Sequence, residues 1–162
     1  MSDQEESGVA KPQWLTADEL EAWRGFMKLL QRLPAALGWQ LQQDSQLSFI
    51  EYYVLALLSE QPGRRMRMSE LASLVNSELS RLSHLVGRLE KRGFLWREPD
   101  PRDGRYTHAI LADAGYAYLE EAAPGHVRQV RELFIDVLDS KELHALRQCS
   151  DKVVARLDRA SR

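Results

Sequence analysis

Residues 77–111 read SELSRLSHLVGRLEKRGFLWREPDPRDGRYTHAIL, and the pattern of this stretch changes half-way along. In its first half, apolar residues recur at helical spacing between an N-cap at Ser77 and a C-cap at Gly93. Two short runs with strand character follow, one on each side of the turn-forming residues PDPRDG. The stretch therefore predicts a helix over residues 78–92 that leads directly into a β-hairpin.

The predicted helix has two faces of opposite character when its residues are placed at 100° intervals. One face is an apolar stripe that we expect to be buried: Leu79, Leu82, Leu85, Val86 and Leu89. The other face holds six hydrogen-bond donors and no acid: Ser77, Ser80, Arg81, His84, Arg88 and Lys91. A solvated face is one interpretation, but solvated helices usually mix acids and bases to form i,i+4 pairs. Cations beside small hydroxyls favour the major groove of DNA, where serine permits close approach.

Within that interpretation five of the six side chains take one of two roles. We expect Ser80, Arg81 and His84 to read base edges, and Arg88 and Lys91 to hold phosphates.

The wing, residues 97–106, with its tip DPRDGR at 100–105, is the second candidate contact with DNA. A hairpin tip beside a groove-reading helix can enter the minor groove, where narrow A·T-rich DNA attracts arginine. Arg102 and Arg105 are the candidates. Asp100 and Asp103 look out of place on such a surface, but a carboxylate beside a guanidinium can hold it bidentately. The alternative is a charged tip that only keeps the hairpin soluble.

Helical patterns surround this region. Glutamates three residues after Thr16, Ser48 and Asp139 form capping boxes, each opening a helix. A short helix capped by Ser69 ends near Val75, and with the helix at 78–92 it fits a helix-turn-helix, although the connection has no glycine.

Pro34 is expected to kink or break the first helix, and Pro124-Gly125 is expected to interrupt the helix after the wing. The strands are expected at Phe94–Arg97 and Tyr106–Leu111. The order is four helices, two strands and two helices, which is a mainly α fold with a small β-hairpin wing.

The charges of the chain are unevenly distributed. The whole chain has a net charge of −2, yet residues 64–105 carry ten Arg or Lys against six acids. A basic middle inside acidic flanks indicates a local site for a polyanion. Arg64, Arg65 and Arg67, just before the short helix, are candidates for further phosphate contacts.

Other features exclude several classes of protein. The single cysteine, Cys149, rules out an intramolecular disulfide framework and suits a reducing cytoplasm. No apolar run approaches the roughly 20 residues of a membrane span, and the acidic N-terminus is typical of a disordered leader. The sequence shows no phosphate-cradling glycine loop, nucleophile elbow or His/Cys metal spacing, so we expect no enzyme, metal or cofactor.

Residues 79–115, LSRLSHLVGRLEKRGFLWREPDPRDGRYTHAILADAG, resemble the MarR family of bacterial transcription regulators. The likeness in element order extends from about residue 16 to 158. It implies a winged helix-turn-helix homodimer on a pseudo-palindromic site in double-stranded DNA, with residues 78–92 in the major groove and repression as the common mode. By motif position the minor-groove arginine is Arg105, with Asp103 bracing it.

The resemblance also suggests a division of the chain. It comprises a leader (1–15), an N-terminal dimerisation region (16–46), the winged helix-turn-helix (47–112) and C-terminal dimerisation helices (113–162). Heptad-spaced apolar residues at both ends suit packing against a partner chain. The family's threonine cap after the wing is replaced by Ala112, and we expect Asp113 to cap instead.

Three questions stay open at the level of sequence. A winged helix can also contact proteins, although that use expects an apolar or acidic outer face. The aromatic residues Trp14, Trp23, Trp39, Tyr52 and Tyr53 fit either a core or a pocket for a small effector of unknown identity. We interpret Cys149 as a buried or interfacial thiol, which would react only if exposed beside a cation.

Overall fold

A computed structural model describes residues 12–160. Most of the predicted leader, residues 1–11, therefore lies outside the described residues. The elements in chain order are α1 (Ala17–Ser45), α2 (Phe49–Ser59), η1 (Pro62–Arg64), β1 (Arg65–Arg67), α3 (Met68–Leu74), α4 (Leu79–Lys91), β2 (Leu95–Pro99), β3 (Thr107–Leu111), α5 (Asp113–Val130), η2 (Arg131–Ile135) and α6 (Ser140–Ala160). The chain divides into two compact units between Leu33 and Pro34. The predicted fold class, mainly α with a small β wing, is confirmed.

The three capping boxes begin helices as the sequence predicts. The Thr16 hydroxyl accepts from the Glu19 N–H at 3.3 Å, and the Glu19 carboxylate accepts from the Thr16 N–H at 2.8 Å. Ser48 and Glu51 form the same reciprocal pair at the start of α2. At the start of α6, the Asp139 carboxylate accepts from the Glu142 N–H at 2.8 Å.

The other three predicted caps are wrong. The N-caps of α3, α4 and α5 are Arg67, Glu78 and Ala112, none of which makes a side-chain capping bond. Strand β1 runs directly into α3, so Ser69 already lies inside that helix. The Ser77 hydroxyl donates instead to the Glu78 carbonyl at 3.2 Å. The Asp113 carboxylate is engaged elsewhere, by Arg64.

The predicted interruptions at proline are also wrong. Helix α1 continues through Pro34 and α5 continues through Pro124. Both prolines are exposed. The carbonyls that lose their helical donors there can bond to water, which lowers the cost of keeping the helix intact.

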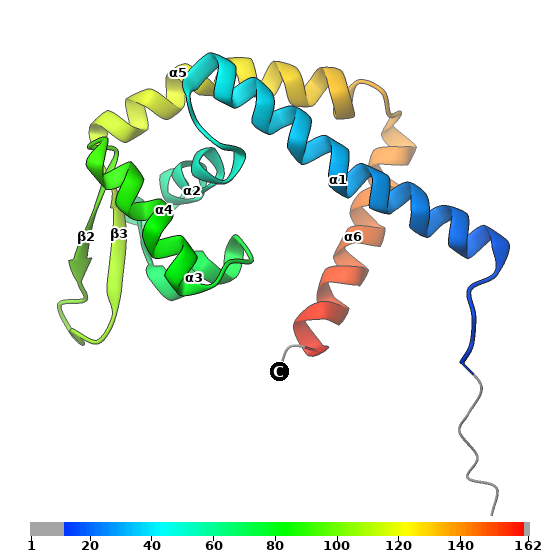
Figure 1. Cartoon of the computed structure of the whole chain (residues 1–162), viewed down its shortest axis with the longest axis horizontal. Coiled ribbons are helices and arrows are strands. Elements are labelled where there is room, and N and C mark those ends of the chain that lie inside the picture. The colour runs from blue at the N-terminus through cyan, green and yellow to red at the C-terminus, as the bar shows by residue number, and fades with distance from the viewer. Residues whose placement is uncertain (1–11, 161–162) are drawn as a thin grey trace, which may run out of the picture. The chain divides into compact units, whose positions relative to one another are not determined.

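A third strand joins the predicted hairpin. The sheet has the antiparallel order β1-β3-β2, with Met66 opposite Ala109 and Arg97 also opposite Ala109 from the other side. Figure 1 shows the β2–β3 hairpin with α4 beside it. The sequence pattern did not predict strand β1, because this strand has only three residues and two of them are arginines.

The core lies among α2, α3, α4 and the inner face of the sheet. Leu82, Leu85, Val86 and Leu89 of α4 are all buried in it, as the predicted stripe requires. Leu79, the fifth member of that stripe, is instead 52% exposed. It is the first residue of α4 and lines an open hollow together with Met68 and Ser69 of α3.

The connection between α3 and α4 needs no glycine, because Asn76 takes its place. Asn76 has φ 48°, a left-handed conformation that asparagine tolerates better than most residues. The Ser77 N–H then donates to the Ala72 carbonyl at 2.9 Å, which closes the end of α3 as a Schellman motif. Gly93, with φ 73°, ends α4 as predicted.

Gly115 permits the closest approach in the fold's wing region. The Phe94 carbonyl accepts from the Ala112 N–H at 2.9 Å and lies directly over Gly115. A Cβ on residue 115 would stand 2.0 Å from that oxygen. The start of α5 therefore rests on the start of the wing only because residue 115 has no side chain.

Gly115→Ala should lower the free energy of unfolding by about 1–3 kcal/mol or more, because backbone has to move to admit the methyl group. Urea unfolding at a fixed protein concentration measures the effect. The matched control is Gly104→Ala, whose added methyl group meets no atom within 4 Å. Equal unfolding midpoints for the two variants would contradict the close approach.

His126 of α5 lies against two aromatic rings of α2. Its ring centroid is 4.3 Å from that of Tyr52 and 6.2 Å from that of Phe49. Its Nδ1 atom is buried without a hydrogen-bond partner. Burial lowers the pKa of His126 below its ordinary value of 6.5.

This pKa predicts a loss of stability in mild acid. The unfolded imidazole takes up its proton near pH 6.5 while the folded one resists, so the free energy of unfolding falls as the pH drops below about 6.5. His126→Phe should flatten this dependence between pH 8 and pH 5.5, measured by urea unfolding. His144→Phe, on exposed α6, is the control that should keep it. An unchanged pH dependence in His126→Phe would refute the assignment.

Candidate nucleic-acid interface

The outer face of α4 presents an unpaired set of donors. Ser80, Arg81, His84 and Lys91 are all exposed. Across residues 12–160, none of these four makes a side-chain hydrogen bond or ion pair. An open hollow of about 510 Å³ borders this face, and its lining includes Ser77, Arg81, His84 and Arg88. Four of the six predicted residues thus have unpaired polar groups on one exposed surface within residues 12–160, and a fifth, Ser77, lies half-buried at its edge.

Arg88, the sixth member of the face in helical angle, differs from the others because it has a partner. Its Nε and Nη2 atoms both lie 3.2 Å from Oε1 of Glu51, on α2. The Arg88 side chain keeps 60% of its exposure, whereas Glu51 is almost fully buried. The prediction of a free phosphate-binding cation did not anticipate this pairing.

At the tip of the wing, Arg105 is held by Asp103. Nη2 of Arg105 donates to Oδ2 of Asp103 at 2.7 Å, and Nε donates to Oδ1 at 3.0 Å. These hydrogen bonds hold the pKa of the Asp103 carboxyl below its ordinary value. The Arg105 side chain stays 85% exposed. The brace implied by the family resemblance is present in the structure, and it holds the guanidinium in solvent.

Asp100 organises the backbone of the same tip. Its Oδ1 accepts from the N–H groups of Arg102 at 2.8 Å and Asp103 at 3.2 Å. Its Oδ2 lies 3.6 Å from both Arg67 Nη2 and His108 Nε2. The backbone bond from Arg102 is the main reason that the pKa of Asp100 is lowered. Arg102 itself is exposed, and its guanidinium has no partner in the described part of the chain.

The three arginines of the β1 region are engaged within the protein. Arg64 pairs with Asp113 at 3.0 Å, Arg65 with Glu98 at 3.3 Å and Arg67 with Asp100 at 3.6 Å. Arg64 also lies over the ring of Tyr116, and Arg67 over that of Tyr106. These cations fasten β1 to the wing and to α5, so their charge is largely compensated.

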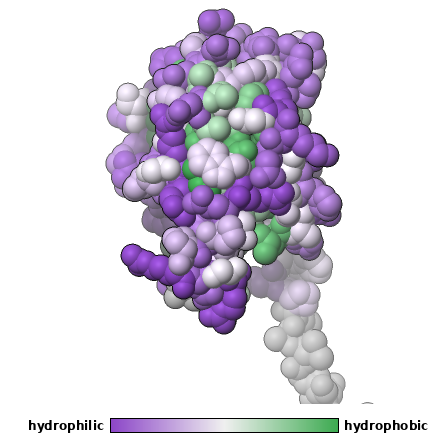
Figure 2. Space-filling view, turned by 90° about the vertical axis from the view of Figure 1, so that its left-hand side faces the viewer, coloured by the Kyte–Doolittle hydropathy of each residue, from purple (hydrophilic) through white to green (hydrophobic). Residues whose placement is uncertain are grey.

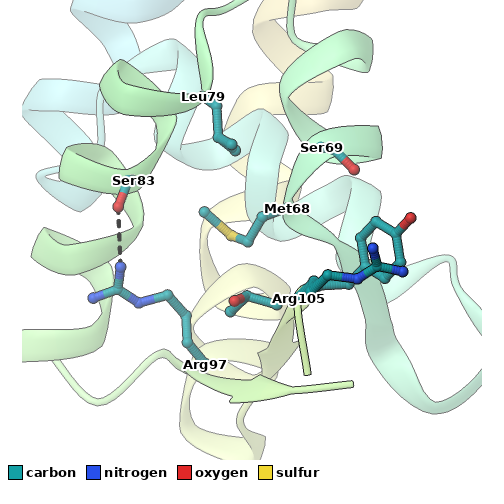
Figure 3. A pocket seen from close by; sticks show the side chains of 8 residues that line it. Met68, Ser69, Leu79, Ser83, Arg97 and Arg105 are labelled. Carbon is teal, nitrogen blue, oxygen red and sulfur yellow. Dashed lines mark hydrogen bonds between the residues drawn. The ribbon is translucent and has the colours of Figure 1, made fainter. Parts of the chain in front are cut away.

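A second hollow, of about 200 Å³, is lined by residues of α3, α4 and the wing. Arg97 and Arg105 stand on opposite sides of it, and the exposed Leu79 points into it (Figure 3). Nη1 of Arg97 donates to the Ser83 hydroxyl at 3.1 Å and Nη2 donates to Glu90 at 2.8 Å. Sequence reasoning missed Ser83 and Arg97 as members of this surface, because their pairing links residues 14 positions apart across two elements.

The surface on the wing side is mostly hydrophilic. Figure 2 shows this side with a central apolar patch and a smaller one below it, both bordered by hydrophilic side chains. Within residues 12–160, no group of three His, Cys, Asp or Glu side chains is placed to hold a metal ion, and no helix is long and apolar enough to cross a membrane. Cys149 is exposed, so it is not buried within its own chain.

Helices α3 and α4 with the β2–β3 hairpin form a winged helix-turn-helix. Two solved structures from Streptomyces coelicolor share this fold over nearly the whole chain. The first is Sco3205, a MarR family transcriptional regulator in complex with DNA: it is 41% identical, with a TM-score of 0.85, covering 90% of this chain and 91% of that one. The second is AbsC, also a MarR family transcriptional regulator: it is 35% identical, with a TM-score of 0.86, covering 91% of this chain and 99% of that one.

Sequence comparison agrees with the structural one. The MarR family profile matches residues 45–105. The transcriptional repressor MprA of Escherichia coli is 28% identical over 107 residues, which are 66% of this chain and 60% of MprA. The chain belongs to the MarR family. Members of this family are transcription regulators and not enzymes.

Proposed function

We propose that the protein is a sequence-specific DNA-binding transcriptional regulator that acts as a homodimer on a pseudo-palindromic operator. Helix α4 lies in the major groove and the wing, residues 97–106, in the minor groove. The observation that carries this proposal is the exposed, acid-free face of α4 beside an arginine that Asp103 displays at the wing tip. Family membership supports this function and not a winged helix that contacts only proteins.

The roles of the site residues follow from their surroundings. Ser80, Arg81 and His84 lie in the N-terminal half of α4, and we assign them to base edges. Ser77 lies two residues before the helix and contacts the DNA at the same end of it. Lys91, at the other end, holds a phosphate. In the wing, Arg105 enters the minor groove with Asp103 as its brace, and Arg102 contacts the flanking backbone. Arg88 contributes from the same face in a different way, argued below.

The dimer is supported by apolar side chains on the terminal helices. Trp23, Phe26 and Leu30 of α1 are each between 45% and 52% exposed, and Val153 and Val154 of α6 are 55% and 53% exposed. Large apolar surfaces of this kind commonly mark protein interfaces. We assign residues 16–46 and 113–162 to dimerisation and 47–112 to DNA reading. A two-fold dimer then requires half-sites about one helical turn apart.

The mode of regulation is proposed by similarity. Sco3205 was solved with DNA bound, and MprA is a transcriptional repressor. We therefore propose that this protein represses transcription, in the cytoplasm. The test is a titration of the wild-type protein against its own upstream DNA and a scrambled duplex at several salt concentrations. Tight, sequence-dependent binding with a steep negative dependence on salt is expected, because each phosphate contact releases counterions. Absence of binding to either duplex at low salt would overturn the function.

Arg105→Ala should weaken operator binding by about 1–3 kcal/mol if Arg105 enters the minor groove. Fluorescence anisotropy with a labelled operator measures the change. Lys152→Ala, on exposed α6, removes the same charge away from the proposed interface and should leave the affinity nearly unchanged. Equal affinities for Arg105→Ala and wild type would rule out the wing assignment.

Lys91 and Arg81 should respond differently to a change of DNA sequence. Lys91→Ala should weaken operator and scrambled duplex alike and make the salt slope shallower by about 1, because a phosphate carries no sequence information. Arg81→Ala should chiefly reduce the preference for the operator, by about 1–3 kcal/mol, because a base contact is lost. The two roles are wrongly assigned if Lys91→Ala alone changes the preference.

A further inference from the structure

The C-terminal end of α4 is tied to the turn that joins α1 to α2. We define this α1–α2 corner as residues 45–51. Two arginines reach it from α4: Arg88 contacts the Glu51 carboxylate with two nitrogens at 3.2 Å, and Nη1 of Arg92 donates to the Gln46 carbonyl at 3.0 Å. The two links are one helical turn apart, so they hold α4 against rotation as well as translation.

Glu51 is built to receive Arg88. Its residue is 9% exposed, and its Oε2 atom already accepts from the Ser48 N–H and the Ser48 hydroxyl, both at 2.9 Å. Oε1 is left for Arg88. Burial alone would raise the pKa of Glu51, but the bonds from Ser48 and Arg88 outweigh it and lower that pKa. A buried carboxylate keeps its charge only with such partners.

Arg92 also links the α1–α2 corner to α5, through Tyr118. The Arg92 guanidinium lies 4.5 Å from the ring centroid of Phe94 and 5.3 Å from that of Tyr118. The Tyr118 hydroxyl donates to the Ser45 carbonyl at 2.6 Å. Gln46, whose own carbonyl accepts from Arg92, has φ 50°, a conformation that costs free energy for a residue other than glycine. The end of α1, the start of α2, the end of α4 and α5 thus meet at one set of contacts.

Arg88 therefore stands apart from the other cations of its face. Lys91 and Arg81 have exposed groups without a partner in the part of the chain that the structure describes. The Arg88 guanidinium is directed to a buried carboxylate on another helix. We propose that Arg88 is a positioning residue, which with Glu51 fixes the orientation of the recognition helix against the α1–α2 corner, and that it is not a phosphate contact. This inference rests on the proposed function and assigns Arg88 within it.

The two roles predict opposite effects for a change at Glu51. If Arg88 positions α4, Glu51→Gln weakens operator binding as Arg88→Gln does, and the double variant is no worse than either single one. If Arg88 binds phosphate, Glu51→Gln frees a cation and leaves operator binding equal or tighter. Glutamine can still complete the capping box with Ser48, so Glu51→Gln keeps the start of α2.

The experiment measures operator and scrambled-duplex affinities of the full-length wild type, both single variants and the double variant across salt concentrations. We expect a loss of operator affinity of roughly 3- to 30-fold in each variant, without additivity and with the wild-type salt slope. Lys91→Gln is the matched control, which should lower both affinities and the slope. A slope reduced by about 0.9 in Arg88→Gln, with Glu51→Gln unimpaired, would overturn the proposal.

Hydrogen exchange on the free proteins gives a readout that needs no DNA. Both single variants should exchange faster than wild type at the amides of residues 88–94, and Lys91→Gln should not. If the wild type binds no DNA while this exchange pattern appears, the proposed function fails and the tie between α4 and the corner stands. Unchanged exchange in Arg88→Gln and Glu51→Gln would refute the tie itself.

Discussion

Burial of one apolar stripe of α4 is the constraint on which the rest of the site depends. Leu82, Val86 and Leu89 are each 1% exposed or less, and Leu85 is 6% exposed. At about 25 cal/mol per Å² of apolar surface, four such side chains supply several kcal/mol, far more than any exposed ion pair nearby. A rotation of α4 about its axis would expose this stripe. Burial of the apolar stripe therefore determines which face of α4 is exposed to solvent. The cations are exposed because they lie on that opposite face.

The positive charge of residues 64–105 is smaller at the surface than the sequence suggests. Several of its arginines face carboxylates of the same domain: Arg64, Arg65, Arg67, Arg88, Arg97 and Arg105. Exposed pairs of this kind contribute little to stability, typically under about 1 kcal/mol each. Their effect is on geometry, because each fixes one element to another or one side chain in one rotamer. Within residues 12–160, Arg81, Lys91 and Arg102 are exposed cations without a carboxylate partner, as the proposed contacts with DNA require.

Local pattern predicted the elements well, and non-local contacts explain what it missed. The helical period predicted α4 and its buried stripe, and the turn residues predicted the hairpin. Each of these patterns depends only on residues that are close together in the sequence. Strand β1 depends on pairing with β3 more than 40 positions away, and Arg88 depends on Glu51, 37 positions away. Leu79 fits the stripe by angle, yet it is 52% exposed at the edge of an open hollow. Spacing along one helix carries no information about such neighbours.

The aspartates of the wing fit the proposed contact with DNA, because they orient an arginine in advance. An arginine side chain in free solution has about 2 kcal/mol of rotamer entropy, part of which is lost on binding. Asp103 removes much of that freedom in advance, while Asp100 fixes the backbone that carries both residues. The negative charge weakens attraction to phosphate, but screening by salt reduces that cost for groups this exposed. The paired guanidinium is therefore attracted less strongly to DNA from a distance. Once in contact, it loses less rotamer entropy, so more of the interaction free energy remains. Because this gain depends on the direction of the side chain, it favours a groove of fitting shape over an isolated phosphate.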